Sequence, residues 1–110
     1  MKLLYIDLFC GAGGTSTGVE AARVDKDKCA KVIACVNHDK NAIASHAANH
    51  PEAKHYTEDI RTLDISELIR HTKSERKKYK DSKVVLWVYS PLTKETKVEP
   101  SPTMAACWRV

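Results

Sequence analysis

The sequence predicts an α/β fold with a mainly parallel sheet and flanking helices, as in a partial Rossmann-like domain. Three apolar runs of strand length, near residues 2–8, 31–37 and 84–89, alternate with segments of helical periodicity. A short extended piece near 54–56 adds a further strand. The first run ends in glycines and continues directly as a helix, an order that forms the ligand-binding turn of doubly wound sheets.

The turn after the first strand is the most informative segment. It reads Tyr5-Ile-Asp-Leu-Phe-Cys-Gly-Ala-Gly-Gly-Thr15, and a helix near 15–24 follows it. Because glycine has no Cβ, the backbone can approach a ligand closely, and the N–H groups that begin the helix can donate to that ligand. The segment therefore predicts a site for a nucleotide-like cofactor.

Two other ligand-binding loops have related patterns. A phosphate-binding P-loop ends in Gly-Lys-Ser/Thr, whereas Gly14 is followed by Thr15 without a lysine. A dinucleotide fingerprint, Gly-x-Gly-x-x-Gly, requires a glycine where this chain has Ser16. A dinucleotide-binding protein and a purely structural turn stay open as alternatives.

The order of residues in the loop is more specific than its glycines. Asp7-Leu-Phe-Cys-Gly-Ala-Gly-Gly14 resembles the first motif of the cytosine-5 DNA methyltransferases, Asp-Leu-Phe-x-Gly-x-Gly-Gly. These enzymes transfer a methyl group from S-adenosylmethionine (SAM) to cytosine in DNA, so the resemblance implies SAM as cofactor and DNA as partner. By resemblance, Phe9 lies against SAM and the glycines make room for its methionine part. The cofactor residues implied in this segment are Asp7, Phe9, Gly11, Ala12, Gly13 and Gly14.

The second strand and its helix extend the resemblance. Asn37 and His38 follow the apolar run, and Asp39 can cap a helix near 39–49. In the family, an acid at the first position binds the SAM ribose and an aromatic residue at the second stacks on adenine. The resemblance assigns these roles to Asn37 and His38, although Asn37 lacks the charge that strengthens a bond to a hydroxyl. An exposed helix-start position is the alternative for His38.

A third similarity follows the short extended piece. Glu58-Asp59-Ile60 resembles the family motif Gly-Asp-Ile, and Asn49-His-Pro51 resembles the helix exit before it. The resemblance implies that Asp59 accepts a hydrogen bond from the adenine amino group and that Ile60 packs on the ring. The alternative is a loop aspartate that caps the next segment.

A helix near 65–79 is predicted before the last strand. Asp64 and Glu67 form a capping-box-like pair at its start. Its C-terminal lysines favour the negative end of the helix dipole, and a contact with DNA phosphates is the alternative to a solvated helix end. The residues expected to share one face are Ile65, Leu68, Ile69, Arg76 and Tyr79.

The resemblance ends where the catalytic residue is expected. Pro91 matches the proline of the family's Pro-Cys pair, and Leu92 stands where the nucleophilic cysteine belongs. That cysteine adds as a thiolate to carbon six of a flipped cytosine, and leucine has no such group. We therefore expect Pro91 in the cofactor site, no catalytic nucleophile, and a chain that is inactive alone with weak or residual SAM binding.

Length and composition indicate one small domain. The chain has 110 residues, 43% of them hydrophobic, and a net charge of +4. We expect a SAM-binding half-domain at 1–92 and an irregular tail at 93–110, such as a truncation or frameshift would produce. The strand at 84–89 would then be an exposed edge that favours self-association or a second polypeptide. A non-catalytic subunit of this kind is a second alternative function.

The remaining patterns predict neither metal nor membrane. The histidines at 46, 50 and 55 have no metal-site spacing, so we expect no metal. No signal peptide or membrane-length apolar run is apparent, which favours a cytoplasmic protein. The cysteines form neither a zinc pattern nor a disulfide framework; they are Cys10, Cys29, Cys35 and Cys107.

Overall fold

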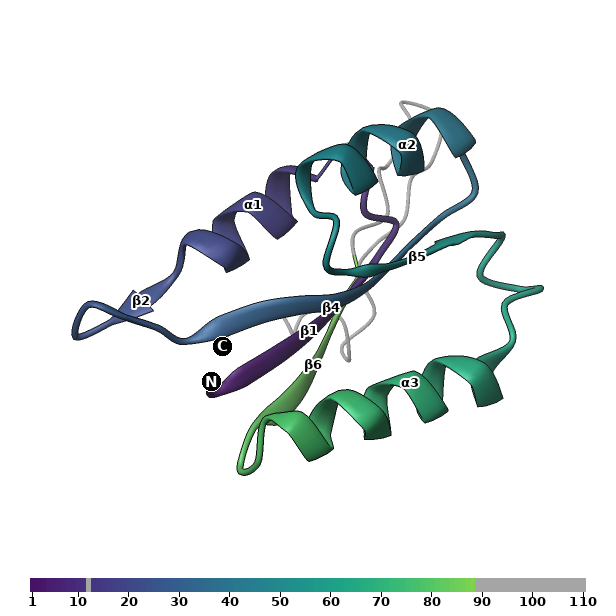
Figure 1. Ribbon diagram of the computed structural model, residues 1–110. Helices are drawn as coiled ribbons and strands as arrows, with labels where there is room; N and C mark the ends of the chain where they lie inside the picture. Colours follow the sequence, from purple (N-terminus) through teal and green to yellow (C-terminus); the bar gives the residue numbers. More distant parts are fainter. Residues whose placement is uncertain (12, 89–110) are drawn as a thin grey trace, which may run out of the picture.

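Apart from a short hairpin after the first helix, strands and helices alternate along the chain in the computed structural model, which describes residues 1–11 and 13–88. A four-stranded parallel sheet has the order β5-β4-β1-β6, with α1 and α2 on one face and α3 on the other (Figure 1). The predicted α/β fold is therefore confirmed. The elements are β1 (Leu3–Leu8), α1 (Gly14–Ala21), β2 (Arg23–Val24), β3 (Asp27–Lys28), β4 (Ala30–Asn37), α2 (Lys40–Asn49), β5 (Lys54–Thr57), α3 (Ile65–Lys78) and β6 (Lys83–Val88).

β1 lies between β4 and β6 and places the glycine loop at the middle of the sheet. From β1 the chain moves outward to β4 and β5, and then returns to β6 on the other side of β1. The topological switch point therefore lies at the carboxyl ends of β1 and β6. Doubly wound sheets bind their ligands at this position.

Two clusters of buried side chains hold the three layers together. β4 contributes to both clusters, which explains why its sequence is apolar on both faces. The cluster beneath α3 consists of Leu4, Ile6, Ile33, Ala34, Val36, Tyr56, Leu63 and Leu68. The cluster beneath α1 and α2 consists of Cys10, Val32, Cys35, Ile43 and Ala53.

β4 contains one extra residue relative to β1. The pairing passes from Tyr5–Val32 to Ile6–Ala34, so Ile33 has no opposite residue in β1. An irregularity of this kind is a β-bulge. As a result, two consecutive residues, Ile33 and Ala34, both belong to the cluster beneath α3.

The end of α1 differs from the prediction. α1 ends at Ala21 rather than near residue 24, because residues 23–28 form a short antiparallel hairpin of β2 and β3. Its tip residues Asp25 and Lys26 have φ values of 49° and 73°. Tight hairpin turns need such positive φ values and usually contain glycine or asparagine. Neither residue type occurs at this tip, and Asp25 alone is a weak signal for a hairpin turn.

The buried face of α3 also differs from the prediction. Asp64 caps the helix as expected and Leu68 is buried, but Ile65 and Ile69 are 51% and 48% exposed. The polar residue His71 lies toward the sheet, with its Nε2 2.8 Å from a carbonyl oxygen of β4. Hydrophobic periodicity does not detect a helix face with polar inward positions. At 14 residues α3 is the longest described helix, and neither it nor the others is long and apolar enough to cross a membrane.

β6 is an edge strand of the sheet within the described residues. Its exposed apolar side chains match the expectation of an apolar edge, while association through it stays a prediction. The exposed fractions lie between 37% and 62% for Val84, Leu86, Trp87 and Val88.

Candidate cofactor site

The glycine loop joins β1 to α1 along a tightly turned path. The backbone N–H of Cys10 donates to the carbonyl of Val36 at 3.1 Å, which ties the loop to the end of β4. Phe9, Gly11 and Gly13 have φ values of 61°, 54° and 107°. Glycine adopts this left-handed conformation readily, whereas for Phe9 it costs about 1 kcal/mol or more of conformational free energy. Strain on a bulky residue clusters at ligand-binding positions, so Phe9 is a candidate ligand contact.

The glycines of the loop differ in their surroundings. A Cβ on Gly11 or Gly14 would meet nothing within 4 Å, so both positions border open space. A Cβ on Gly13 would lie 3.1 Å from Cδ2 of His46 and 3.3 Å from the ring of His50. Gly11 and Gly14 therefore leave room for a ligand, whereas Gly13 makes room for two histidines behind the loop. Ala12 lies outside the described residues.

α1 begins without a side-chain cap, unlike the other two long helices. Gly13 is its N-cap residue, no side chain of the described residues caps it, and its first turn has no acid. Asp39 caps α2 and Asp64 caps α3. The N–H groups and the positive dipole end of α1 are therefore available to a carboxylate or phosphate.

A small cavity lies at the carboxyl ends of β1, β4 and β5. Its volume of about 40 Å³ is close to that of one water molecule, whereas sites for whole small-molecule ligands measure about 300–1,000 Å³. The cavity is thus one corner of a larger site. Residues from all three motifs line this corner: Phe9, Val36, Asn37, His38, Glu58, Asp59 and Ile60. Five of the seven are predicted cofactor residues; Val36 and Glu58 are additional.

Two polar side chains of this corner already have partners within the protein. Asn37 accepts the backbone N–H of Asp39 at its Oδ1 (2.9 Å), which leaves its amide NH₂ as a donor for a ligand. Asp59 accepts from the guanidinium of Arg61 at 2.8 and 3.0 Å and from its backbone N–H at 2.8 Å. The bonds from this guanidinium hold the pKa of Asp59 well below its usual range. Asp59 is therefore ionised and retains further lone pairs.

Behind the loop, a chain of buried polar side chains joins four elements. Ser16 of α1 donates to Oδ2 of Asp7 in β1 at 2.7 Å, and Nε2 of His46 in α2 lies 2.8 Å from the same hydroxyl. Nδ1 of His46 lies 2.8 Å from Nε2 of His55 in β5. Asp7, Ser16 and His46 are at most 2% exposed. β1, α1, α2 and β5 thus meet in one hydrogen-bonded cluster.

This cluster places Asp7 away from the five predicted cofactor residues that line the corner. Its carboxylate faces Ser16 inside the protein and does not line the corner cavity. Burial raises the pKa of Asp7, and the hydrogen bond from Ser16 partly offsets that effect. In this structure Asp7 supports the start of α1, directly behind the loop.

Cys10 and Cys35 lie against His46 in the same cluster. Their Sγ atoms and a ring nitrogen of His46 are within 4.8 Å of one another, and Cys35 Sγ lies 3.3 Å from Nε2. The three residues come from three elements, so their spacing in the sequence did not reveal the group. Nε2 of His46 also lies 2.8 Å from the Ser16 hydroxyl, so the group is continuous with the hydrogen bonds to Asp7. The group is a hydrogen-bonded core.

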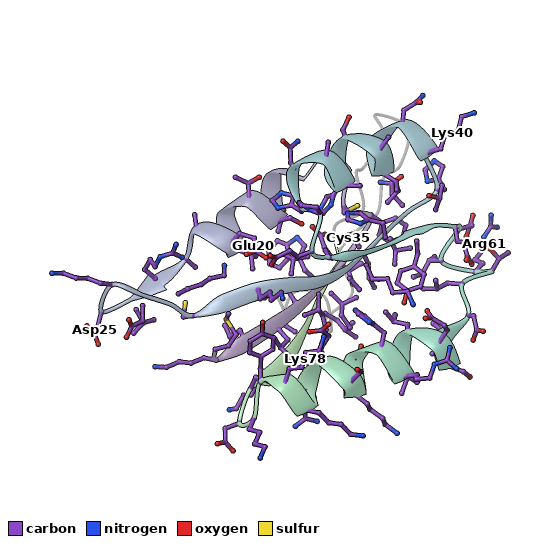
Figure 2. The ribbon with its side chains drawn as sticks, in the orientation of Figure 1. Glu20, Asp25, Cys35, Lys40, Arg61 and Lys78 are labelled. Atoms are coloured by element: carbon purple, nitrogen blue, oxygen red, sulfur yellow. The ribbon has the colours of Figure 1, made fainter. Side chains whose placement is uncertain are left out.

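The basic end of α3 lies away from the corner. α3 ends at Lys78 and leads into Lys83, which pairs with Leu3 at the beginning of β1. The glycine loop and the corner lie at the opposite, carboxyl edge of the sheet, and Figure 2 shows Arg61 and Lys78 at opposite ends of α3. This position favours a solvated helix end for the lysines.

Comparisons with known proteins agree with this geometry. Residues 3–76 match the family model for C-5 cytosine-specific DNA methylase. A crystal structure of an E. coli prophage-encoded protein, described as a "putative DNA modification methyltransferase", is 33% identical with a TM-score of 0.54. The match covers 67% of this chain and 20% of that one, so this chain spans about a fifth of its length. No curated protein matches the sequence.

Proposed function

Because this chain belongs to the family of C-5 cytosine-specific DNA methylases, we propose that residues 1–92 form the SAM-binding half of a methyltransferase catalytic domain. The family uses SAM as methyl donor. The observation that carries the proposal is the corner cavity, which five residues from three separate family motifs line together. DNA is the proposed partner, and residues 93–110 are proposed as a tail outside this half-domain.

In this proposal the corner binds the adenosine part of SAM. Phe9 and Ile60 offer apolar surfaces to the adenine, and His38 stacks on its ring. Asp59 accepts from the adenine amino group with a lone pair that Arg61 does not use. Asn37 donates its amide hydrogens to a ribose hydroxyl.

The glycine loop then binds the methionine part. The open space beside Gly11 and Gly14 fits the chain of this group, and the uncapped N–H groups of α1 suit its carboxylate. Ala12 and Pro91, which lie outside the described residues, complete the proposed cofactor set by their motif positions. Bound SAM would supply an electrophilic methyl group on its sulfonium sulfur.

We propose that this chain alone binds SAM weakly and does not methylate DNA. Leu92, also outside the described residues, cannot form the covalent bond to carbon six of cytosine. Without that bond carbon five stays unreactive toward the methyl group. A second polypeptide that supplies a cysteine is the proposed route to an active enzyme.

Calorimetry with SAM, S-adenosylhomocysteine and NAD tests the cofactor assignment. We expect the first two to bind and NAD not to bind. Phe9→Ala and Asp59→Asn should weaken SAM binding. Asp64→Asn makes the same loss of charge at a residue that does not line the corner and retains an N-cap for α3, so it should leave the affinity unchanged. Binding of NAD without binding of SAM would support the dinucleotide alternative and contradict our proposal.

Transfer of a radiolabelled methyl group from SAM to DNA tests the proposed inactivity. We expect no incorporation by the chain alone and none by Leu92→Cys alone, since one thiol does not extrude or hold the base. Methyl incorporation by the unmodified chain that disappears in Gly13→Val would refute the proposal that the chain alone is inactive. Cys107 would then be the first nucleophile to test.

A further inference from the structure

We propose that His46 is a positioning residue that keeps the glycine loop in its ligand-binding shape. The inference rests on the proposed SAM site and adds a residue that does not line the corner cavity. Its basis is the buried chain of Asp7, Ser16, His46 and His55. The first three residues of this chain are at most 2% exposed, so water does not replace their hydrogen bonds.

The direction of each bond in the chain follows from the acceptor at its end. Asp7 accepts, so the Ser16 hydroxyl donates its one hydrogen to the carboxylate at 2.7 Å. The Ser16 oxygen therefore accepts from Nε2–H of His46 at 2.8 Å. Nδ1 of His46 is then unprotonated and accepts from Nε2–H of His55 at 2.8 Å. The chain selects one tautomer of His46 and pairs both of its ring nitrogens.

The same chain requires a neutral His46. Burial lowers the pKa of His46 to about 4, and the neighbouring His50 and His55 add to this effect. The other titratable groups facing the ring are the Cys10 and Cys35 thiols and, beyond Ser16, the Asp7 carboxyl. A protonated ring would place an N–H at Nδ1 opposite the N–H of His55, so acid breaks this bond.

His46 and its neighbour His50 also form the wall behind the loop. The space that a Cβ on Gly13 would fill is closed by the His46 ring at 3.1 Å. The centroid of that ring lies 4.7 Å from the centroid of the His50 ring, whose Nε2 is 3.2 Å from the Thr17 hydroxyl. Thr17 in turn donates to the carbonyl of Gly13 at 2.9 Å. Any shift of His46 therefore moves both the loop and the uncapped start of α1.

Substitution of His46 tests the proposal. His46→Phe keeps a planar ring but removes both hydrogen bonds, and we expect SAM affinity to fall about ten-fold. His46→Gln keeps a donor near the Nε2 position and should recover part of that loss. Ser16→Ala interrupts the hydrogen-bond chain with a smaller change and should also weaken SAM binding. If His46→Phe does not fold, Ser16→Ala provides the test: circular dichroism shows whether it is folded, and calorimetry measures its SAM affinity.

His71→Phe is the matched control on the other face of the sheet. It removes the hydrogen bond from His71 to a β4 carbonyl and should lower stability without changing SAM affinity. The contrast separates a positioning effect from a loss of stability, because a merely structural role would make both histidines behave alike.

Nitrogen-15 NMR of the histidine rings reads the tautomer directly in the unmodified chain. We expect His46 to carry its proton on Nε2 and to show no titration above about pH 5. A proton on Nδ1, or titration near the ordinary pKa of about 6.5, would overturn the inference. So would equal SAM affinities of the unmodified, His46→Phe and Ser16→Ala chains, although the SAM site would stand. Absence of SAM binding to the unmodified chain would overturn the proposed function together with this inference.

Discussion

The two faces of the sheet are held by different kinds of interaction. Beneath α3 the buried cluster is apolar and extends from Leu4 to Leu68. Beneath α1 and α2 a smaller apolar cluster surrounds the buried polar residues Asp7, Ser16 and His46. Apolar packing stabilises without strong directionality, whereas a buried hydrogen-bond chain tolerates one arrangement only. The α3 face therefore contributes mainly stability, and the α1–α2 face determines the geometry of the glycine loop.

Among the variants considered, Gly13→Val should have the largest effect on the α1–α2 face. A valine at φ 107° is strained and its Cβ meets His46 behind the loop, which together lower the free energy of unfolding by about 3 kcal/mol. SAM binding should become undetectable by calorimetry. Gly18→Ala, within α1 and with nothing within 4 Å, is the control and should raise stability by about 0.5–1 kcal/mol. Unchanged SAM affinity in Gly13→Val would show that the packing of His46 and His50 behind the loop does not control its ligand-binding shape.

Leu68→Ala should affect stability alone. Leu68 is 7% exposed in the apolar cluster beneath α3, and its truncation should cost about 2–3 kcal/mol in urea denaturation. SAM affinity should stay unchanged. Ile69→Ala on the outer face should cost less than about 0.5 kcal/mol. A parallel loss of SAM binding in Leu68→Ala would show that the two faces are not independent.

Acid should destabilise the α1–α2 face. The pKa of His46 falls from 6.5 to about 4 on folding, so the unfolded chain binds the proton more tightly. Its contribution is complete above about pH 6.5 and decreases as the pH falls toward 4, by about 2 kcal/mol between pH 7 and pH 5. Burial lowers the pKa of His55 and adds to this loss, whereas the raised pKa of Asp7 acts in the opposite direction.

Urea denaturation at the two pH values measures this effect. His46→Gln should remove most of the difference, because the remaining contribution from His55 is smaller than that of the fully buried ring. A free energy of unfolding that is equal at both pH values in the unmodified chain would show that the unfolded and folded chains bind the same number of protons.

Asn37→Glu should produce a smaller gain in affinity. A carboxylate in place of the amide would make a charge-assisted bond to the ribose, tightening SAM binding by about 1 kcal/mol. Its oxygen can still accept the N–H of Asp39, so the fold should not change. Asn49→Glu adds the same charge at the far end of α2 and serves as the control in calorimetry. Equal gains from both variants would indicate a general charge effect.

Leu86→Lys should change association and little else. Leu86 is 62% exposed on the edge strand β6, and a charge there opposes pairing of edges. Stability should move by less than about 0.5 kcal/mol. Light scattering at high concentration should show fewer dimers or aggregates than for the unmodified chain. A monomeric unmodified chain would disprove self-association through β6.

Local patterns in the sequence predicted most of the sheet and the corner. The strands near 2–8, 31–37 and 84–89 are continuous apolar runs, and the glycine loop has a distinctive order of residues. The motif resemblance identified Phe9 and Asp59, which the fold brings to one cavity. These signals are local because each depends on a few consecutive residues.

The remaining features depend on contacts between distant segments. Ser16, His46 and His55 lie on three different elements, and no spacing in the sequence indicates that they form a chain. The inward position of His71 depends on a carbonyl that β4 presents to α3. Patterns of apolar residues do not encode polar groups that satisfy one another after the chain folds.

The bulge in β4 determines on which face each later residue of that strand appears. Side chains alternate along a strand, so one extra residue exchanges the two faces for every position after it. Cys35 consequently packs beneath α1 and α2, and Val36 beneath α3. The same sequence in a regular strand without the bulge would turn Cys35 toward the α3 face and Asn37 to the opposite side of the sheet. All the motif residues would still be present in the sequence, but Asn37 would no longer lie beside Phe9 and Asp59 in the corner cavity.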